Sequence, residues 1–253
     1  MKKSIFFLFL FSFLYCSVFS QTYRRAIDFS GKRVGLNKSS VLSGVVKKRL
    51  DGKPVLYSTM NDAIIDLRAG KIDGFIVDLS VAIAFAEDRG NTDLRVIEIP
   101  DSTFISTIGA CSADKIIIDR FNIFLVKIET DGTLKEMQSR WFNSKEDVVH
   151  PDIKSSGLKG VMKVATSSRS KPFAFKEKDT FKGFSVELVK RFASSIEYSI
   201  IFEDLMFHEM IPAVKEKKVD LAISNISITP ERQKIVIFSE PYYTEKAGMI
   251  IRK

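Results

Sequence analysis

Cysteine and histidine are nearly absent from this chain, and so are the short motifs that mark metal and catalytic sites. The 253 residues include two cysteines and two histidines, and no CxxC, HExxH, GxSxG or P-loop pattern occurs among them. We therefore expect no metal, no cofactor and no enzymatic activity. Long basic runs are also missing: 39 Lys and Arg stand against 31 Asp and Glu, and the excess of +8 is scattered along the chain. This pattern argues against a nucleic-acid partner.

Low-complexity sequence is missing as well. Hydrophobic residues make up 45% of the chain and charged residues 28%, which excludes a disordered protein and allows a well-packed core. No apolar run reaches the roughly 18–20 residues that a membrane-spanning helix needs. The length fits one large domain or two lobes of about 100 residues each.

The N-terminus has the layout of a secretory signal peptide. Lys2 and Lys3 precede an apolar run over residues 5–14, and Val18-Phe19-Ser20 offers a cleavage site. We expect residues 1–20 to be a signal peptide that is removed when the mature chain is exported.

Cysteine usage fits export without a disulfide. Cys16 stands in a segment that loosely resembles a lipoprotein signal, but the preceding Tyr15 is bulkier than the small residue usual there. A cleaved signal is therefore the preferred interpretation. Cys111 would then be unpaired in an oxidising compartment, and we expect it to be a small buried apolar group.

The chain contains one pattern twice. Residues 64–78 and 211–225 align at a constant offset, with apolar residues at helical spacing, then Lys-Ile-Asp or Lys-Val-Asp, then a short β-rich run. Upstream, each copy has another strand and a strand–helix pair. These elements are expected at 54–57, 32–36 and 41–50 in the first copy, and at 199–202, 161–165 and 184–196 in the second. Strands that alternate with helices of this length predict two α/β lobes with mostly parallel sheets.

Polar residues follow the strands of both copies. In open α/β sheets, ligands bind beyond the carboxyl ends of the strands. The loops concerned cover residues 37–40, 78–80, 166–173 and 225–232. In the last loop, Thr229 and Pro230 suit a helix start, but Arg232 places a cation in the first turn, where the helix dipole disfavours it. An anion bound in front of this turn would reverse that effect.

Asp78 and Arg232 together make the charge pattern that holds a zwitterion. Arginine offers a planar donor fork that fits a carboxylate, and Asp78, at the end of the matching strand, can receive an ammonium group. Simpler interpretations exist, with Asp78 as the N-cap of a helix over 81–88 and Arg232 as a surface charge. Phe207 is as compatible with a core position as with a stacking platform. The shared placement at strand ends favours the ligand site.

Four strings carry a family resemblance. They are Ser-Ile-Thr-Pro-Glu-Arg at 227–232, Phe-Ser-Glu-Pro-Tyr-Tyr at 238–243, Gly-Lys-Arg-Val-Gly-Leu at 31–36 and Lys-Ile-Asp-Gly-Phe-Ile-Val-Asp at 71–78. Residues 158–251 resemble the first segment of the family 3 extracellular solute-binding proteins, which bind polar amino acids in the periplasm, and residues 31–142 resemble the remaining segment. The resemblance implies a two-lobed fold of the type II periplasmic binding proteins, with a mostly parallel, helix-flanked sheet in each lobe.

The two segments stand in the reverse of the family's order, so the sequence indicates a circular permutant; a truncated tandem receptor would give the same order. The implied organisation is lobe 2 at 27–103, a hinge strand at 104–112, lobe 1 at 113–246 with a permutation linker at 143–157, and a second hinge strand at 247–253. The ends, near Arg25 and Lys253, are expected to lie close together at the hinge.

The resemblance also implies roles for residues in the loops. Arg232 would clamp the ligand's α-carboxylate with help from Ser227. Asp78 would take the α-ammonium group, with the carbonyl of Asn225 as a further acceptor. Phe207 matches an aromatic residue that packs on the ligand in some relatives.

At three serine positions this sequence departs from the family pattern or matches it weakly. Ser167 stands where many relatives carry Asp, which weakens the case for a cationic amino acid. Ser170 stands where they carry Tyr or Phe, which removes an aromatic partner and leaves the side-chain specificity open. Ser40 would add a hydrogen bond to the ammonium group, in a loop that lacks the family's usual Gly-Thr-Thr.

We therefore expect a monomeric periplasmic protein that captures a free amino acid between two lobes and delivers it to an ABC-type permease in the inner membrane. The lobes would close because only the closed form contacts the ligand from both sides. Three alternatives remain: a sensor subunit of a signalling receptor, an enzyme on the same scaffold, and a ligand-free relative kept for an interaction.

Overall fold

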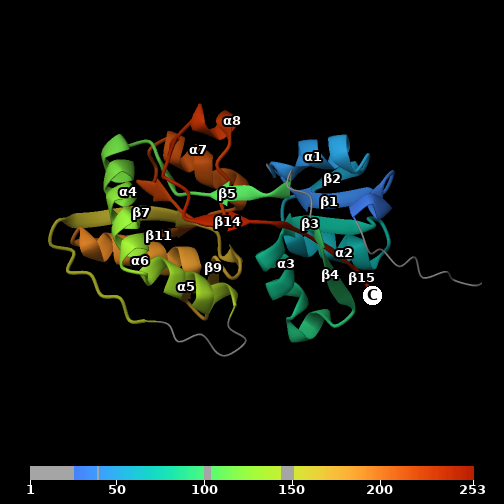
Figure 1. The fold of residues 1–253 in the computed structure, drawn as a ribbon, viewed down its shortest axis with the longest axis horizontal. Coiled ribbons are helices and arrows are strands. Elements are labelled where there is room, and N and C mark those ends of the chain that lie inside the picture. The colour runs from blue at the N-terminus through green and yellow to red at the C-terminus, as the bar shows by residue number, and fades with distance from the viewer. Residues whose placement is uncertain (1–25, 39, 100–103, 144–150) are drawn as a thin grey trace, which may run out of the picture.

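The computed structural model describes residues 26–38, 40–99, 104–143 and 151–253. They form two α/β lobes that are joined by a pair of strands (Figure 1). The expected signal peptide, Cys16 and part of the expected linker 143–157 lie outside the described residues. Within the described part, no helix is long and apolar enough to cross a bilayer.

The first lobe is built on a five-stranded sheet in the order β2-β1-β3-β15-β4. Its strands are β1 (Arg33–Asn37), β2 (Lys53–Tyr57), β3 (Gly74–Asp78), β4 (Leu94–Ile99) and β15 (Ala247–Arg252). Strand β1 pairs in parallel with β2 and β3, and β15 runs antiparallel between β3 and β4. The sheet is covered by α1 (Leu42–Arg49), α2 (Met60–Arg68) and α3 (Leu79–Ala86), with short 3-10 turns η1 (Ala26–Phe29) and η2 (Arg89–Asn91) at its margins.

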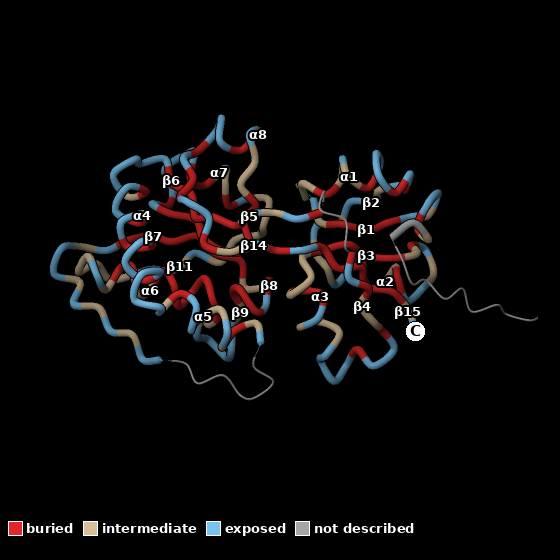
Figure 2. Tube along the Cα trace, viewed as in Figure 1, coloured by how far each residue is buried: buried red, intermediate tan, exposed pale blue. Residues whose placement is uncertain are grey.

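Both faces of this sheet are buried, as the unbroken apolar run of β3 predicts. Ile76 packs in one apolar cluster with Val34 and Val46, while Phe75 packs in another with Leu67. Figure 2 shows the strands as the buried centre of each lobe, with exposed loops around them.

The second lobe repeats this plan with the order β11-β7-β12-β6-β13. Its strands are β6 (Cys111–Ser112), β7 (Gly160–Thr166), β11 (Tyr198–Asp204), β12 (Leu221–Ala222) and β13 (Ile237–Phe238). Again three parallel strands are followed by an antiparallel one, β6. The predicted mostly parallel sheets are therefore present. Strands β15 and β6 are antiparallel because each enters its sheet at the cleft, directly from the other lobe, without a helical crossover.

The helices of the second lobe are α4 (Lys115–Thr130), α5 (Thr133–Phe142), α6 (Phe184–Ser195), α7 (Met210–Lys215) and α8 (Pro230–Gln233), with η4 (Phe207–Glu209) before α7. The loop expected between residues 166 and 183 contains a small sheet of β8 (Arg169–Ser170), β9 (Ala174–Glu177) and β10 (Thr180–Lys182). Gly183 ends this loop at φ +127°, where a Cβ atom would lie 2.2 Å from the carbonyl oxygen of Phe173. Only glycine allows this close approach, which brings the start of β9 against the start of α6.

The lobes are connected by β5 (Ser106–Ile108) and β14 (Tyr243–Glu245), which pair antiparallel. The hinge strand expected at 104–112 thus divides into β5, which crosses, and β6, which joins the second sheet. The segment expected as a second hinge strand at 247–253 lies inside the first sheet as β15, and the crossing falls before it, at β14. A crossing needs few residues, and the rest of each segment gains ladder hydrogen bonds by joining a sheet.

Both described ends of the chain lie in the first lobe. Phe29 of η1 packs in one apolar cluster with Met249 and Ile251 of β15. The expectation that the ends lie at the hinge is wrong: β15 begins at the cleft, where Ala247 pairs with Asp78, and runs away from it toward the C-terminus (Figure 1).

Candidate binding cleft between the lobes

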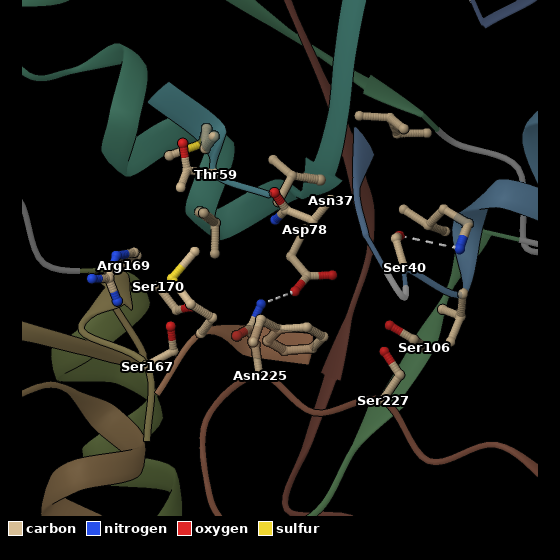
Figure 3. Close-up of a pocket in the computed structure, with 18 of the residues that line it drawn as sticks. Asn37, Ser40, Thr59, Asp78, Ser106, Ser167, Arg169, Ser170, Asn225 and Ser227 are labelled. Carbon is tan, nitrogen blue, oxygen red and sulfur yellow. Dashed lines mark hydrogen bonds between the residues drawn. The ribbon is translucent and has the colours of Figure 1, made fainter. Parts of the chain in front are cut away.

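A cleft lies between the lobes, and all eight residues singled out from the sequence line it. They are Ser40 and Asp78 from the first lobe and Ser167, Ser170, Phe207, Asn225, Ser227 and Arg232 from the second. Four of them lie at the carboxyl end of a parallel strand: Ser40 follows β1, Asp78 ends β3, Ser167 follows β7 and Asn225 follows β12. The strand-end rule therefore places these side chains together, and all eight residues except Phe207 and Arg232 are labelled in Figure 3.

Asp78 lies at the centre of the cleft. It occupies the N-cap position of α3 but makes no side-chain capping bond, so its simpler interpretation does not hold. Its Oδ2 accepts a 2.5 Å hydrogen bond from Nδ2 of Asn225 in the other lobe (Figure 3). Ser224 fixes that amide, because its hydroxyl donates to Oδ1 of Asn225 at 3.1 Å. Burial raises the pKa of Asp78 to about 6, against the opposing effects of this hydrogen bond and of Arg232, so the carboxyl is mainly ionised at neutral pH.

Arg232 is buried, not a surface charge. Thr229 caps α8 by accepting from the Arg232 backbone N–H at 3.2 Å, and Pro230 opens the helix, as expected. The guanidinium donates to the Ser227 carbonyl at 2.8 Å and lies 5.7 Å from the centre of the Phe207 ring. Burial lowers its pKa, which the charge of Asp78 partly offsets. Arginine remains a cation under these conditions because its unperturbed pKa exceeds 12.

The serines of the cleft differ in their surroundings. The Ser40 hydroxyl accepts from the backbone N–H of Leu42, the first residue of α1, at 3.3 Å. Ser167 and Ser170 are buried, at 2% and 7% exposure, and line the cleft beside β8. A polar, non-aromatic wall therefore stands where the family pattern leads one to expect a carboxylate and an aromatic ring.

Several cleft residues were not singled out from the sequence. They are Asn37, Ser58, Thr59, Met60, Ser106, Arg169 and Met206, together with apolar neighbours. Oδ1 of Asn37 is buried without a hydrogen-bond partner in the described structure, so a ligand donor would satisfy it. Thr59 and Met60 follow β2, and the same strand-end rule would have found them had it been applied to that strand. Asn37 and Arg169 lie within two loops that the rule did indicate, 37–40 and 166–173.

Glu245 is a second acidic side chain near Asp78. It is 4% exposed at the end of the crossing strand β14 and accepts from the Ser80 hydroxyl at 2.5 Å and from the Lys246 backbone N–H at 3.0 Å. Burial first, and the charge of Asp78 second, raise its pKa to about 7. No pattern in the sequence distinguished this residue.

Comparison with known proteins finds a family that matches part of the chain. Residues 162–253 match the bacterial extracellular solute-binding proteins, family 3. The arginine-binding extracellular protein ArtP of Bacillus subtilis is 43% identical over 98 residues, which cover 39% of this chain and 38% of ArtP. The cyclohexadienyl dehydratase of Pseudomonas aeruginosa is 33% identical over 84 residues, which cover 33% of this chain and 31% of the enzyme.

One solved structure with a similar sequence is an ancestral protein. The ancestral amino-acid-binding protein AncCDT-1, described as a precursor of cyclohexadienyl dehydratase, is 37% identical over 34% of this chain and 38% of its own, with a TM-score of 0.33. The chain thus matches less than two fifths of the length of each of these relatives. The family assignment made from the sequence is supported for residues 162–253.

Proposed function

We propose that this protein binds a free amino acid in the cleft between its lobes. Residues 162–253 match the bacterial extracellular solute-binding proteins, family 3, which supports this role. The observation that carries the proposal is the meeting of Arg232 and Asp78 in one cleft, from different lobes. A zwitterion needs one cation and one carboxylate at fixed positions, and this pair supplies both.

In this proposal each of the two groups holds one end of the ligand. The Arg232 guanidinium, held on the Ser227 carbonyl, binds the α-carboxylate. Asp78 receives the α-ammonium group in place of the Asn225 amide, and Oδ1 of Asn37 offers a further acceptor. Phe207 supports the Arg232 guanidinium through a cation–π contact, which gives it an indirect part in binding.

Closure of the lobes follows from the way they are joined. Two short crossing strands, β5 and β14, connect the lobes, so bending there opens the cleft without disturbing either sheet. The ligand stabilises the closed form because only that form contacts it from both sides. In the structure the Asn225–Asp78 bond already joins the two lobes across the cleft.

The wider role proposed is that of a periplasmic receptor that delivers the amino acid to an ABC-type permease. Support comes from relatives such as ArtP and the lysine/arginine/ornithine-binding periplasmic protein of Escherichia coli, which is 29% identical over 99 residues. A sensor subunit would use the same cleft. The dehydratase relative shows that an enzyme is the alternative function to consider. Asp78 is the only carboxylate among the described residues that line the cleft. We therefore propose binding without catalysis.

A calorimetric screen of the twenty amino acids tests the proposal. At least one is expected to bind, and at about 100 times its Kd to stabilise the fold by ~2.7 kcal/mol. Arg232→Ala should weaken that binding by about 2–5 kcal/mol, because the α-carboxylate loses its buried partner.

The matched control is Arg120→Ala, which removes an exposed arginine of the same lobe on α4 and should leave the affinity unchanged. A screen without any binder, or equal affinity in Arg232→Ala and the wild type, would contradict the proposed site.

A further inference from the structure

The cleft has one more charged side chain than the backbone charges of an amino acid require. Among the described residues that line it, three side chains are charged: Asp78, Arg169 and Arg232. If Asp78 and Arg232 hold the two backbone charges of the ligand, as proposed above, Arg169 remains. It is a cation, and no described carboxylate lines the cleft to receive a cationic ligand side chain.

The positions of these groups give the ligand a direction. In Figure 3, Ser227, Ser106 and Ser40 lie on one side of Asp78, and Ser167, Ser170 and Arg169 lie on the other. Arg232 binds the carbonyl of Ser227, which places the α-carboxylate on the first side. An amino acid whose ammonium group lies at Asp78 therefore extends its side chain toward β8, which carries Arg169.

Arg169 keeps donor capacity at this position. Its Nη1 lies 3.6 Å from Oδ1 of Asp204, beyond hydrogen-bond distance, and its side chain is 52% exposed. Asp204 is already engaged, since it accepts from Ser168 at 2.8 and 3.0 Å and from Lys176 at 3.0 Å. One carboxylate between two cations leaves a net positive charge at this end of the cleft.

We propose that the ligand is an α-amino acid with an acidic side chain, and that Arg169 is the residue that selects it. The guanidinium fork fits the side-chain carboxylate, and the Ser167 and Ser170 hydroxyls beside it can donate to the same group. Neutralisation also favours this choice, because Arg169, Arg232 and Asp78 sum to one positive charge and an acidic amino acid carries one negative charge. Arginine, the amino acid for which the relative ArtP is named, would by contrast bring its cationic side chain against Arg169.

This inference rests on the proposed function, and titration calorimetry on the whole mature chain tests it with L-glutamate, L-aspartate, L-glutamine and L-arginine. Glutamate or aspartate should bind about tenfold or more tighter than glutamine, since a charge-assisted hydrogen bond contributes about 1.5–3 kcal/mol. Arginine should be the weakest of the four. Arg169→Gln should lower the affinity for the acidic ligand by about tenfold or more and change that for glutamine by less than about threefold.

Lys171→Gln is the matched control, because it removes the same charge two residues away, from an exposed side chain that does not line the cleft; it should leave the preference for the acidic ligand in place. If no amino acid binds the wild type, the proposed function itself fails. If amino acids bind but arginine or glutamine is preferred, or if Arg169→Gln weakens every ligand equally, the inference on Arg169 is overturned while the binding function stands.

Discussion

Glu245 is buried at the end of the crossing strand β14, beside the first lobe, and its titration should be visible in the stability of the fold. The groups facing it are Ser80, the Lys246 backbone and the charge of Asp78. Its own carboxylate acts in turn on Tyr243, whose pKa is raised mainly by burial. The ionised form of Glu245 is thus opposed by burial and by a nearby like charge.

The free energy of unfolding should therefore fall as the pH rises. The folded pKa of Glu245, about 7, lies above the ordinary glutamate pKa of 4.5, so its contribution to stability is fully present below about pH 4.5 and is lost as the pH rises through 7. Urea unfolding between pH 5 and 8 should show a loss of roughly 2.5 kcal/mol from this group. Glu245→Gln should flatten the curve by that amount, and Glu240→Gln, at an exposed site of the second lobe, should not. Parallel curves for the wild type and Glu245→Gln would contradict this assignment.

The cleft residues could be predicted from the sequence to the extent that they obey a rule about strand ends. Asp78, Asn225 and Arg232 follow or end strands with clear patterns, so their meeting was expected. Glu245 was missed because its significance arises from burial against α3, which no local pattern encodes. Arg169 was passed over because it lies in a long loop whose fold depends on the approach of Gly183 to Phe173.

At the level of elements, α5 and α6 are held together by one buried carboxylate. Glu187, 4% exposed, accepts two hydrogen bonds from Arg140 at 2.8 Å, one from Trp141 at 2.8 Å and one from Arg191 at 2.9 Å. Burial opposes its charge, but these bonds outweigh burial and lower its pKa. Breaking such a network leaves buried donors without an acceptor.

Glu187→Ala should destabilise the fold by about 3–5 kcal/mol, because Arg140 and Trp141 lose a buried partner. Chemical denaturation measures the change. Glu136→Ala is the matched control, since Glu136 pairs with the same Arg140 from a 57% exposed position on the same helix, and its loss should cost less than about 1 kcal/mol. If the two variants lost similar free energies of unfolding, the buried network would stabilise the fold no more than the exposed ion pair does.

Most elements were predictable because amphipathic helices and buried strands have distinct periods. The expected helix over 184–196 is α6, with Val189 and Phe192 fully buried on one face. The crossings were placed less well, since β5 and β14 have three residues each, too few for any period. The antiparallel direction of β15 and β6 depends on the lobe from which each arrives, which only the tertiary fold decides.

The whole molecule has an internal symmetry that links the repeat to the cleft. Both sheets have the same strand order and directions, with β3 of the first corresponding to β12 of the second. Asp78 and Asn225, which the hydrogen bond joins across the cleft, are separated by 147 residues and are equivalent positions of the two repeats. The lobes thus face each other through matching strand ends. This symmetry does not depend on the order in which the two halves occur along the chain.

We propose that the chain is a circular permutant of the family, with residues 143–157 joining segments that are the two ends in its relatives. Described residues of this linker lie along the second lobe: the Lys154 carbonyl accepts from Ser194 at 2.9 Å, and Ser155 donates to the carbonyl of Tyr198. The described ends lie in the other lobe, where η1 and β15 share an apolar cluster.

Restoring the family's order should therefore preserve the fold. A chain that runs from 151 to 253, through a flexible Gly/Ser linker, and then from 26 to 143 keeps every sheet pairing, and the change in loop-closure free energy is only about 1 kcal/mol. Its thermal midpoint and amino-acid affinity should match those of the mature protein. A permutant opened at Lys190, in the middle of α6, is the control and should not fold. If the restored chain also fails to fold, or folds without binding the ligand of the native chain, the two segments are not interchangeable in order and the permutation proposal falls.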